Sequence, residues 1–311
     1  MTRHLLEIDD LTAVELADVL ERCSEHHPSR VLDGRGAALL FEKPSARTRH
    51  STEMAVVALG GHPVYVRPDE VGLDVRESAE DVARTLACYH SVIAARVFEH
   101  DKLVRMAAVV PIAVVNLLSE DSHPLQAIAD LLTIRAEFGS FAGRTVAWVG
   151  DYSNVARSLG IAASMVGMGL RFACPDGYQP PADELDRFRA LGAPFAESTD
   201  DPRQAAKGAH VVSTDAWYAM GQEEEAAARR QVFAGYRVDS ALLDAAEPDA
   251  ILLHCLPAHR GEEVTDEAVD GPRSRVWPQA ANRLAAARGA ISWLVSQNDL
   301  AAAAVDGEAG R

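Results

Sequence analysis

The sequence is poor in cysteine and in basic residues, and each shortage excludes a class of protein. It has four cysteines, which are scattered and include no C-x-x-C pair, so neither a disulfide framework nor a zinc site is indicated. Reduced thiols of this kind predict a cytoplasmic protein. The 30 lysines and arginines are outnumbered by 46 aspartates and glutamates, which gives a net charge of −16. A nucleic-acid partner, which needs a basic face, is therefore excluded.

Long hydrophobic runs and a glycine-rich nucleotide fingerprint are also missing. No apolar run is long enough to cross a bilayer, and the start of the chain lacks the hydrophobic segment of a signal peptide, so no membrane partner is expected. A strand over Thr145–Gly150 continues into Asp151 and Tyr152 instead of G-x-G-x-x-G, which disfavours a nucleotide-binding dehydrogenase. The 311 residues, of which 48% are hydrophobic, are enough for two domains of ordinary size.

Strands that alternate with helices predict an α/β fold of two doubly wound parallel-sheet domains joined by long helices. The first domain is expected over residues 1–138 and the second over residues 139–283. Residues 284–311 are expected to form a C-terminal helix that packs back on the first domain, roughly Leu284–Val295, and then a tail that frays from Ala301. In such sheets the ligand binds at the carboxyl ends of the strands.

The stretch Phe41–Arg49, with the sequence FEKPSARTR, joins an apolar strand to a helix. Pro44 marks the corner and Ser45 stands at the N-cap position, so the first helical turn carries Arg47 and Thr48. A helix start offers unpaired N–H groups and partial positive charge, and the hydroxyls and the arginine fork add donors. This combination predicts a phosphate site. The alternative is an ordinary capped helix with solvated arginines.

Four further residues follow predicted strands or open a predicted helix. Arg96 ends an apolar strand, and His123 stands before a helix that begins at Pro124. Asp215 starts a loop rich in aromatic residues, and Cys255 follows a buried strand. Each has an ordinary alternative, which is a surface arginine, a helix cap, an Asx turn and inert packing, respectively. The position of Arg96 and Cys255 at strand ends favours a role in ligand binding, and His123 at a helix start can donate to a carbonyl or phosphate oxygen.

Five motifs occur in one order at domain-scale spacing: FEKPSARTR, HPLQ, DYSNV, TDAWYAMGQE and HCLPAHRGEEV. Together they resemble the carbamoyltransferases, and specifically the ornithine carbamoyltransferases, because aspartate carbamoyltransferases usually lack a cysteine at the position of Cys255. The resemblance covers nearly the whole chain. It implies transfer of the carbamoyl group of carbamoyl phosphate to the side-chain amine of L-ornithine, giving L-citrulline and phosphate in arginine biosynthesis. It also implies a homo-oligomer, a trimer or a multiple of trimers, without metal or organic cofactor.

The resemblance further implies two sets of binding residues. Those for carbamoyl phosphate are Ser45, Ala46, Arg47, Thr48, Arg96, His123, Gln126, Cys255, Leu256 and Arg283. Those for ornithine are Asn154, Asp215, Ala219 and Met220. The implied catalytic residues are Arg96, His123, Asp215 and Cys255.

The chain departs from the family pattern at three places. Ala46 replaces a usual threonine, Ala219 replaces a usual serine, and the Asp69–Arg76 loop is unlike the common form. The departure at Ala219 keeps open a carbamoyltransferase for another amine, such as putrescine or an acylated ornithine. A catalytically silent relative that binds ligand is a second alternative, which the retained charged residues disfavour.

Overall fold

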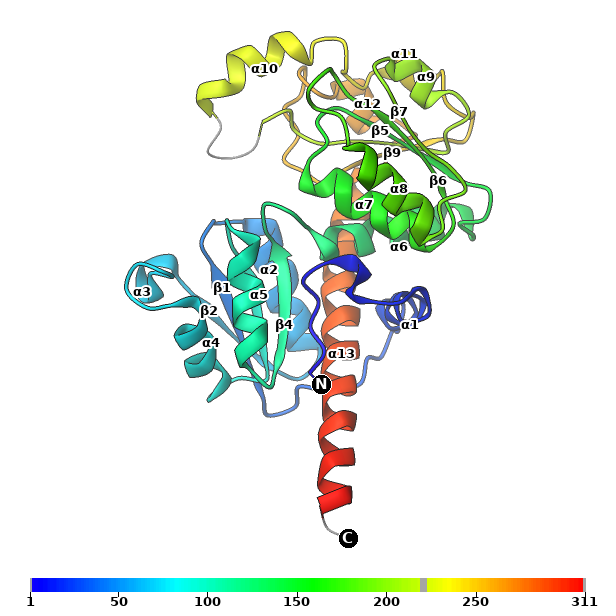
Figure 1. The fold of residues 1–311 in the computed structure, drawn as a ribbon. Helices are drawn as coiled ribbons and strands as arrows, with labels where there is room; N and C mark the ends of the chain where they lie inside the picture. Colours follow the sequence, from blue (N-terminus) through cyan, green and yellow to red (C-terminus); the bar gives the residue numbers. More distant parts are fainter. Residues whose placement is uncertain (1, 219–222, 310–311) are drawn as a thin grey trace. The chain divides into compact units, whose positions relative to one another are not determined.

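The computed structural model describes residues 2–218 and 223–309, which belong to two compact units (Figure 1). The first unit comprises residues 1–128 and 283–311, and the second comprises residues 129–282. Two helices, α6 (Pro124–Phe138) and α13 (Val276–Ala309), continue through the boundaries of this division. Each unit is built on a parallel sheet, which confirms the predicted fold class.

The sheet of the first unit has four parallel strands in the order β2-β1-β3-β4. These strands are β1 (Gly36–Phe41), β2 (His62–Val66), β3 (Val92–Arg96) and β4 (Ala113–Leu118). In the register of β1 with β3, Phe41 pairs with Arg96. The segments that follow these two strands therefore leave the sheet at one edge, as the sequence predicted for Ser45 and Arg96.

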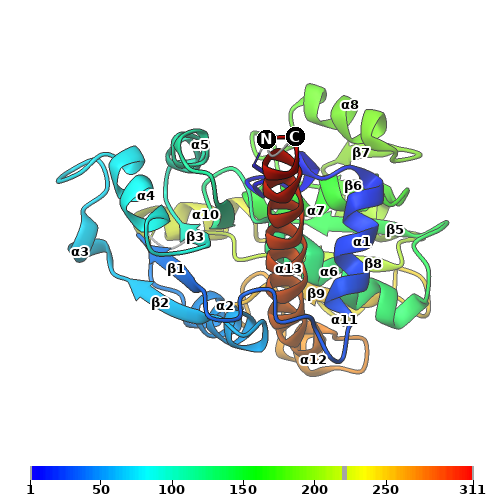
Figure 2. The same ribbon diagram turned by 90° about the horizontal axis from the view of Figure 1, so that it is seen from below.

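Helices cover both faces of this sheet, as Figure 2 shows for α4 and α5 on one face and α2 on the other. The helices of this unit before α6 are η1 (Ile8–Asp10), α1 (Ala13–Cys23), α2 (Ala46–Ala58), α3 (Pro68–Val71), α4 (Ala79–Ala87) and α5 (His100–Val109). Val82, Leu103 and Met106 pack against the sheet in one buried cluster. Helix α5, which the sequence analysis did not predict, therefore contributes to the core.

Helix α1 lies beside the last helix in both ribbon views (Figures 1 and 2). Thr12 caps α1 in a reciprocal capping box with Glu15. The two helices approach closely at Gly289, where a Cβ atom would meet the Cys23 sulfur at 2.3 Å. A glycine is therefore required at this crossing.

Helix α13 is longer than the predicted last helix. It begins at Val276 and continues to Ala309, whereas the sequence indicated a helix over Leu284–Val295 and fraying from Ala301. Pro278 does not delay the start, because it lies in the first turn, where no intrahelical partner awaits its nitrogen. The four alanines from position 301 onward are strong helix formers and continue the helix.

The sheet of the second unit has five parallel strands in the order β7-β6-β5-β8-β9. The strands are β5 (Thr145–Val149), β6 (Gly169–Ala173), β7 (Ala196–Thr199), β8 (Val211–Thr214) and β9 (Ile251–His254). The helices are α7 (Asn154–Met165), α8 (Ala182–Leu191), α9 (Pro202–Ala206), η2 (Glu223–Glu225), α10 (Ala226–Val232), α11 (Ser240–Leu243) and α12 (Asp266–Asp270). Strand β7 and helix α9 were not predicted. Thr214 pairs with His254 in the register of β8 with β9, so the residues after these strands meet at one edge.

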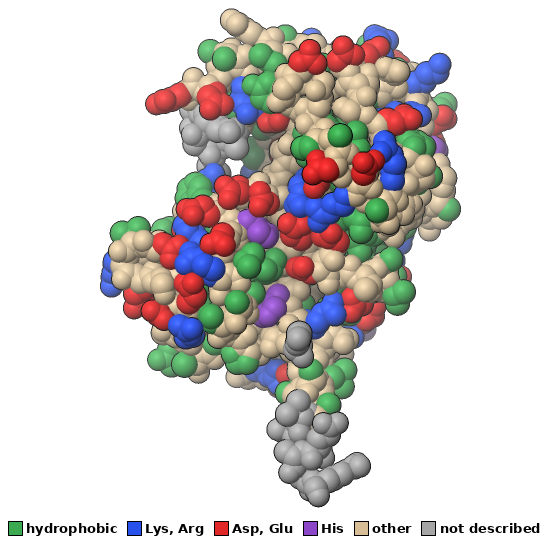
Figure 3. Space-filling view, viewed as in Figure 1, with side chains coloured by type: hydrophobic (Ala, Val, Ile, Leu, Met, Phe, Trp, Pro, Cys, Tyr) green, Lys and Arg blue, Asp and Glu red, His purple; other side chains and the backbone are tan. Residues whose placement is uncertain are grey.

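Acidic and basic side chains are interspersed over the face shown in Figure 3. Acidic residues are spread across this face, as the net charge of −16 leads one to expect. Among the helices that the structure describes, none has the length and hydropathy that crossing a membrane would demand.

Candidate active site

The turn between β1 and α2 has the geometry predicted for an anion site. Ser45 is the N-cap of α2, with extended backbone, and its Oγ accepts a bond from the Thr48 N–H at 3.4 Å. The first turn contains no acidic residue, so no carboxylate offsets the partial positive charge of the helix start. Ala46 and Arg47 in this turn are exposed to solvent. The turn can therefore receive a phosphate group from solvent.

A buried hydrogen-bond network surrounds the Thr48 hydroxyl. Arg96 Nη1 and Arg283 Nη2 each lie 3.3 Å from Thr48 Oγ1. The side chains of Arg96 and Arg283 are almost completely buried, at 8% and 6% exposure. Two guanidinium groups on one hydroxyl make this position strongly electropositive, since charges act over longer distances inside a protein than in water.

Arg283 extends this network to the start of α6. Its Nη1 atom donates to His123 Nε2 at 2.9 Å and to Gln126 Oε1 at 2.8 Å. His123 and Gln126 are buried as well. The structure thus brings together five of the predicted residues in the first unit, which we call the arginine network: Thr48, Arg96, His123, Gln126 and Arg283.

His123 is neutral in this environment. Burial lowers the pKa of its imidazole well below the ordinary value, and the charges of Arg283 and Arg96 lower the pKa further. Because Nε2 accepts the bond from Arg283, the proton of the neutral ring is on Nδ1. His123 can therefore act as an uncharged hydrogen-bond donor.

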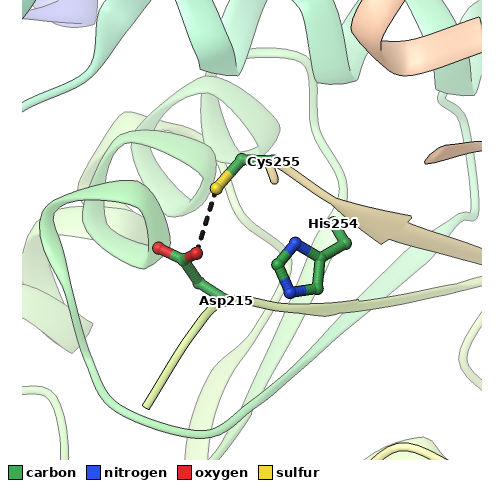
Figure 4. A group of neighbouring side chains, drawn as sticks. All are labelled: Asp215, His254 and Cys255. Carbon is green, nitrogen blue, oxygen red and sulfur yellow. Dashed lines mark hydrogen bonds between the residues drawn. The ribbon is translucent and has the colours of Figure 1, made fainter. Parts of the chain in front are cut away.

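A thiol and a carboxylate meet at the carboxyl edge of the second sheet. Asp215 follows β8 and Cys255 follows β9, and the Cys255 thiol donates to Asp215 Oδ1 at 3.1 Å (Figure 4). The backbone N–H of Ala216 also donates to Asp215 Oδ1, at 2.8 Å. Both Asp215 and Cys255 are half-buried. The pair can therefore accept hydrogen bonds from a ligand amine while staying within reach of solvent.

Asn154, a predicted ornithine ligand, follows the first strand of the second unit. It opens α7, directly after the N-cap Ser153, and is half-buried. It follows β5, which neighbours β8 in the sheet, so Asn154 and Asp215 lie at the same edge. Ala219 and Met220, the other predicted ornithine ligands, lie outside the described residues.

The structure adds two residues that sequence reasoning did not single out. His254 Nε2 lies 3.1 Å from Glu263 Oε1, and both side chains are fully buried. His254 Nδ1 accepts the backbone N–H of Leu256 at 2.9 Å. Both residues belong to the motif HCLPAHRGEEV, so this motif could have identified them as candidate site residues.

Arg229 also has a role that the sequence did not reveal. The segment around it reads as a solvated polar helix, but the Arg229 side chain is buried. Its Nη1 atom donates to Asp151 Oδ2 and to the Trp217 carbonyl, both at 2.7 Å. Burial raises the pKa of Asp151, although the bond to Arg229 opposes that change. Arg229 therefore anchors the chain just after Asp215.

Asp215, His254 and Cys255 stand close enough for a metal ion, with ligand atoms within 4.8 Å of one another. Figure 4 shows the three side chains together. However, Nδ1 of His254 already accepts from Leu256, and Nε2 bonds to Glu263. The imidazole has no remaining lone pair to offer, so the group fits a hydrogen-bonded site and not a metal centre.

Comparisons with known proteins agree with one another over both units. A family model for the aspartate/ornithine carbamoyltransferase carbamoyl-P binding domain matches residues 3–136, and the model for the Asp/Orn binding domain matches residues 142–294. The ornithine carbamoyltransferase of Acidothermus cellulolyticus is 48% identical, over 95% of this chain and 97% of that protein.

Solved structures give the same result. The ornithine carbamoyltransferase from Thermus thermophilus has a TM-score of 0.86 and 43% identity, covering 95% of this chain and 99% of that one. The ornithine carbamoyltransferase from Pyrococcus furiosus has a TM-score of 0.89 and 40% identity, covering 94% and 96%.

Proposed function

The chain belongs to the aspartate/ornithine carbamoyltransferase family, and from this membership we infer that it transfers the carbamoyl group of carbamoyl phosphate to the side-chain amine of L-ornithine. The products are L-citrulline and phosphate, and the reaction belongs to arginine biosynthesis. The observation that carries this function is the match of both family models, together with relatives at 48% and 43% identity that are named ornithine carbamoyltransferase.

We propose that residues 1–138 form the carbamoyl-phosphate-binding domain and residues 139–283 form the ornithine-binding domain. The two family models, which match 3–136 and 142–294, support this assignment. Residues 284–311 would then return to the first domain, and the assignment of residues 283–311 to the first compact unit supports that proposal.

We propose that the phosphate group binds at the start of α2. Ser45, Arg47, Thr48 and the backbone of Ala46 are the ligands. The anion-binding character of a helix start without a carboxylate in its first turn supports this placement. These groups stabilise the negative charge that builds on phosphate as it leaves.

The carbamoyl end is assigned to the arginine network and to Cys255 and Leu256. Attack of the amine on the carbonyl carbon produces a tetrahedral oxyanion, which then expels phosphate. Donors fixed before the reaction are often the largest catalytic contribution. Thr48, Arg96 and neutral His123 are such donors. Arg283 bonds to Thr48, His123 and Gln126, and Arg96 bonds to Thr48. No covalent enzyme intermediate is required.

Asn154, Asp215, Ala219 and Met220 are the proposed ornithine ligands. An alkylamine with a pKa of about 10 is about 99.9% protonated at pH 7, which costs roughly 4 kcal/mol before attack is possible. Desolvation lowers that cost by favouring the neutral amine. We propose that Asp215 and Cys255 orient the bare amine, and the hydrogen bond between them supports this role.

We also propose a cytoplasmic homo-oligomer, a trimer or a multiple of trimers. Exposed apolar side chains on the first unit support a subunit interface: Met54 and Val57 on α2 are 52% and 48% exposed, and Val64 lies on the edge strand β2. Sedimentation of the purified chain at several concentrations tests this proposal, and a monomer at all of them would contradict it.

One assay tests the function itself. The enzyme is incubated with carbamoyl phosphate and a panel that contains ornithine, putrescine and an acylated ornithine, and phosphate release and ureido product are measured. We expect L-citrulline with ornithine alone. Product with another amine and none with ornithine would establish the alternative substrate, and no product with any amine would indicate a silent relative.

A further inference from the structure

We propose that Glu263 and His254 are positioning residues that fix the backbone beside Cys255 for the transfer reaction. Neither residue touches a substrate in this proposal; both act through the backbone of Leu256. The inference rests on the proposed function, because it matters for catalysis only if Cys255 and Leu256 border the reacting groups. It extends that function by two residues that the family resemblance did not assign.

Glu263 is an unusual side chain to find in an interior. It is 0% exposed, and its Oε1 accepts from His254 Nε2 at 3.1 Å and from the His259 backbone N–H at 2.5 Å. A buried carboxylate costs several kcal/mol of desolvation unless hydrogen bonds offset it. A hydrocarbon of similar volume would fill the space without that cost. The carboxylate therefore has a purpose that packing alone does not explain.

The Glu263 carboxylate determines which nitrogen of the His254 imidazole carries the proton. Because Glu263 accepts at Nε2, the ring proton is held on Nε2 and the lone pair is left on Nδ1. Nδ1 then accepts the Leu256 N–H at 2.9 Å. In the other tautomer, Nδ1–H would face the Leu256 N–H, donor against donor. Glu263 thus selects the tautomer that binds Leu256.

Leu256 needs this bond because of its backbone conformation. Its φ angle is +61°, in the left-handed region that costs a residue with a Cβ atom about 1 kcal/mol or more. On the other side, the His254 backbone N–H donates to Gln279 Oε1 at 2.8 Å. Cys255 therefore lies between two fixed residues, which keeps its sulfur 3.1 Å from Asp215 Oδ1.

The test uses the thiol of Cys255 as a reporter. Cys23 and Cys174 are buried and Cys88 is exposed, so a Cys88→Ser background leaves Cys255 as the accessible cysteine. In that background three variants are compared: Glu263→Leu, which removes the acceptor; Glu263→Gln, which keeps an acceptor oxygen; and Glu262→Leu, a neighbouring control. Iodoacetamide alkylation of Cys255, kcat, and the KM of each substrate are measured for each.

We expect Glu263→Leu to lower kcat by about tenfold or more, since a displaced reacting group is costly. Its alkylation rate should change several-fold, while the KM for carbamoyl phosphate stays within about twofold of the parent because the proposed phosphate ligands Ser45, Arg47 and Thr48 belong to the first unit. Glu263→Gln should rescue both properties, and Glu262→Leu should resemble the parent. A folded Glu263→Leu enzyme with parental kcat and alkylation, or equal losses in the two leucine variants, would overturn the proposal.

A second pair of variants answers the question if Glu263→Leu does not fold. His254→Asn, combined with Glu263→Gln, keeps an acceptor near the position of Nδ1, whereas His254→Leu with Glu263→Gln removes it. The first should retain at least about tenfold more turnover than the second. Equal turnover would overturn the proposal. Failure of the parent to form citrulline would instead contradict the proposed function, and the alkylation rates would still report whether Glu263 positions Cys255.

Discussion

The two sets of site residues are built in contrasting ways. In the first unit, the side chains of the arginine network are buried and bonded to one another, with Thr48 only 2% exposed. In the second unit, Asp215 and Cys255 are half-buried, and the neighbouring Leu256 has a left-handed backbone. The first set consists of buried hydrogen-bond donors. The second is the Asp215–Cys255 pair, next to backbone N–H groups of Ala216, His254 and Leu256 that are hydrogen-bonded.

This contrast fits the two tasks in the proposed reaction. Donors that stabilise developing negative charge act best when they do not reorganise during the reaction. A group that receives an amine from water must instead remain accessible until the amine arrives. Under the proposed function, the buried charged side chains would therefore serve carbamoyl phosphate, and the partly exposed thiol–carboxylate pair would serve the amine.

The largest expected effect comes from removing the centre of the arginine network. Arg283→Leu loses the bonds to Thr48, His123 and Gln126 at once. We expect kcat/KM for carbamoyl phosphate to fall by about a thousandfold, since loss of one fixed donor alone costs 10²–10³. Steady-state kinetics measure this change. Arg288→Leu, on the same helix but bonded to the Cys23 and Glu25 carbonyls, is the control and should lose far less.

A second variant separates the two sides directly. Cys255→Ala removes the thiol that bonds to Asp215 Oδ1, so we expect kcat to fall by about 10- to 100-fold with a displaced pH optimum. Binding of carbamoyl phosphate, measured by equilibrium dialysis, should stay within about twofold of the parent. Cys88→Ala is the matched control at an exposed cysteine. An unchanged rate and pH profile in Cys255→Ala would remove the role proposed for this thiol.

The phosphate turn should show a smaller and one-sided effect. Arg47→Ala removes an exposed guanidinium from the first turn of α2, and we expect the KM for carbamoyl phosphate to rise by about tenfold. The KM for ornithine should change little, because its proposed ligands belong to the second unit. Arg49→Ala, which breaks the 2.8 Å ion pair with Glu53, is the control. Equal weakening of both substrates by Arg47→Ala would contradict the placement of the phosphate.

The smallest expected effect is a pH dependence of stability from His123. Burial lowers the pKa of folded His123, so the unfolded chain binds a proton at a pH where the folded chain does not. The free energy of unfolding should therefore decrease as pH falls below about 6.5, by roughly 1 kcal/mol per pH unit, until folded His123 is protonated too.

Urea denaturation at pH 7.5 and pH 5.5 checks this sign. His123→Gln should lose less stability between the two conditions than the parent does. His26→Gln, at an exposed position in the loop after α1, should behave as the parent. The same pH dependence in His123→Gln as in the parent would show that other groups account for it.

Local patterns predicted most of the framework of both units. The N-cap at Ser45 depends on a few neighbouring residues, and the structure has it as expected. Short elements such as β7 and α9 were missed, since four or five residues carry little periodicity. Ends of helices were also misjudged, as α13 shows.

The site was harder to predict from residues alone, because its contacts are distant in sequence. Arg283 reaches Thr48 across 235 positions, and its place in the site was expected only from the family resemblance. The buried state of Arg229 depends on Asp151, 78 positions away, so its polar surroundings in sequence were misleading. Patterns within a segment describe exposure along one helix or strand and contain no information on a partner elsewhere.

The two edge strands of the first sheet, β4 and β2, differ because the N-terminal segment pairs with β4. Leu5 forms a parallel bridge to Val115, and backbone bonds join Leu5 to Val114 and Asn116, so the middle of the outer side of β4 is paired. The outer side of β2 has no such cover in the part of the chain that the structure describes. Backbone groups that are already paired on the border at β4 are not available to a strand of another molecule, which opposes edge-to-edge association there. Trimming the first seven residues would open this border as well, and the shortened protein should then aggregate more readily.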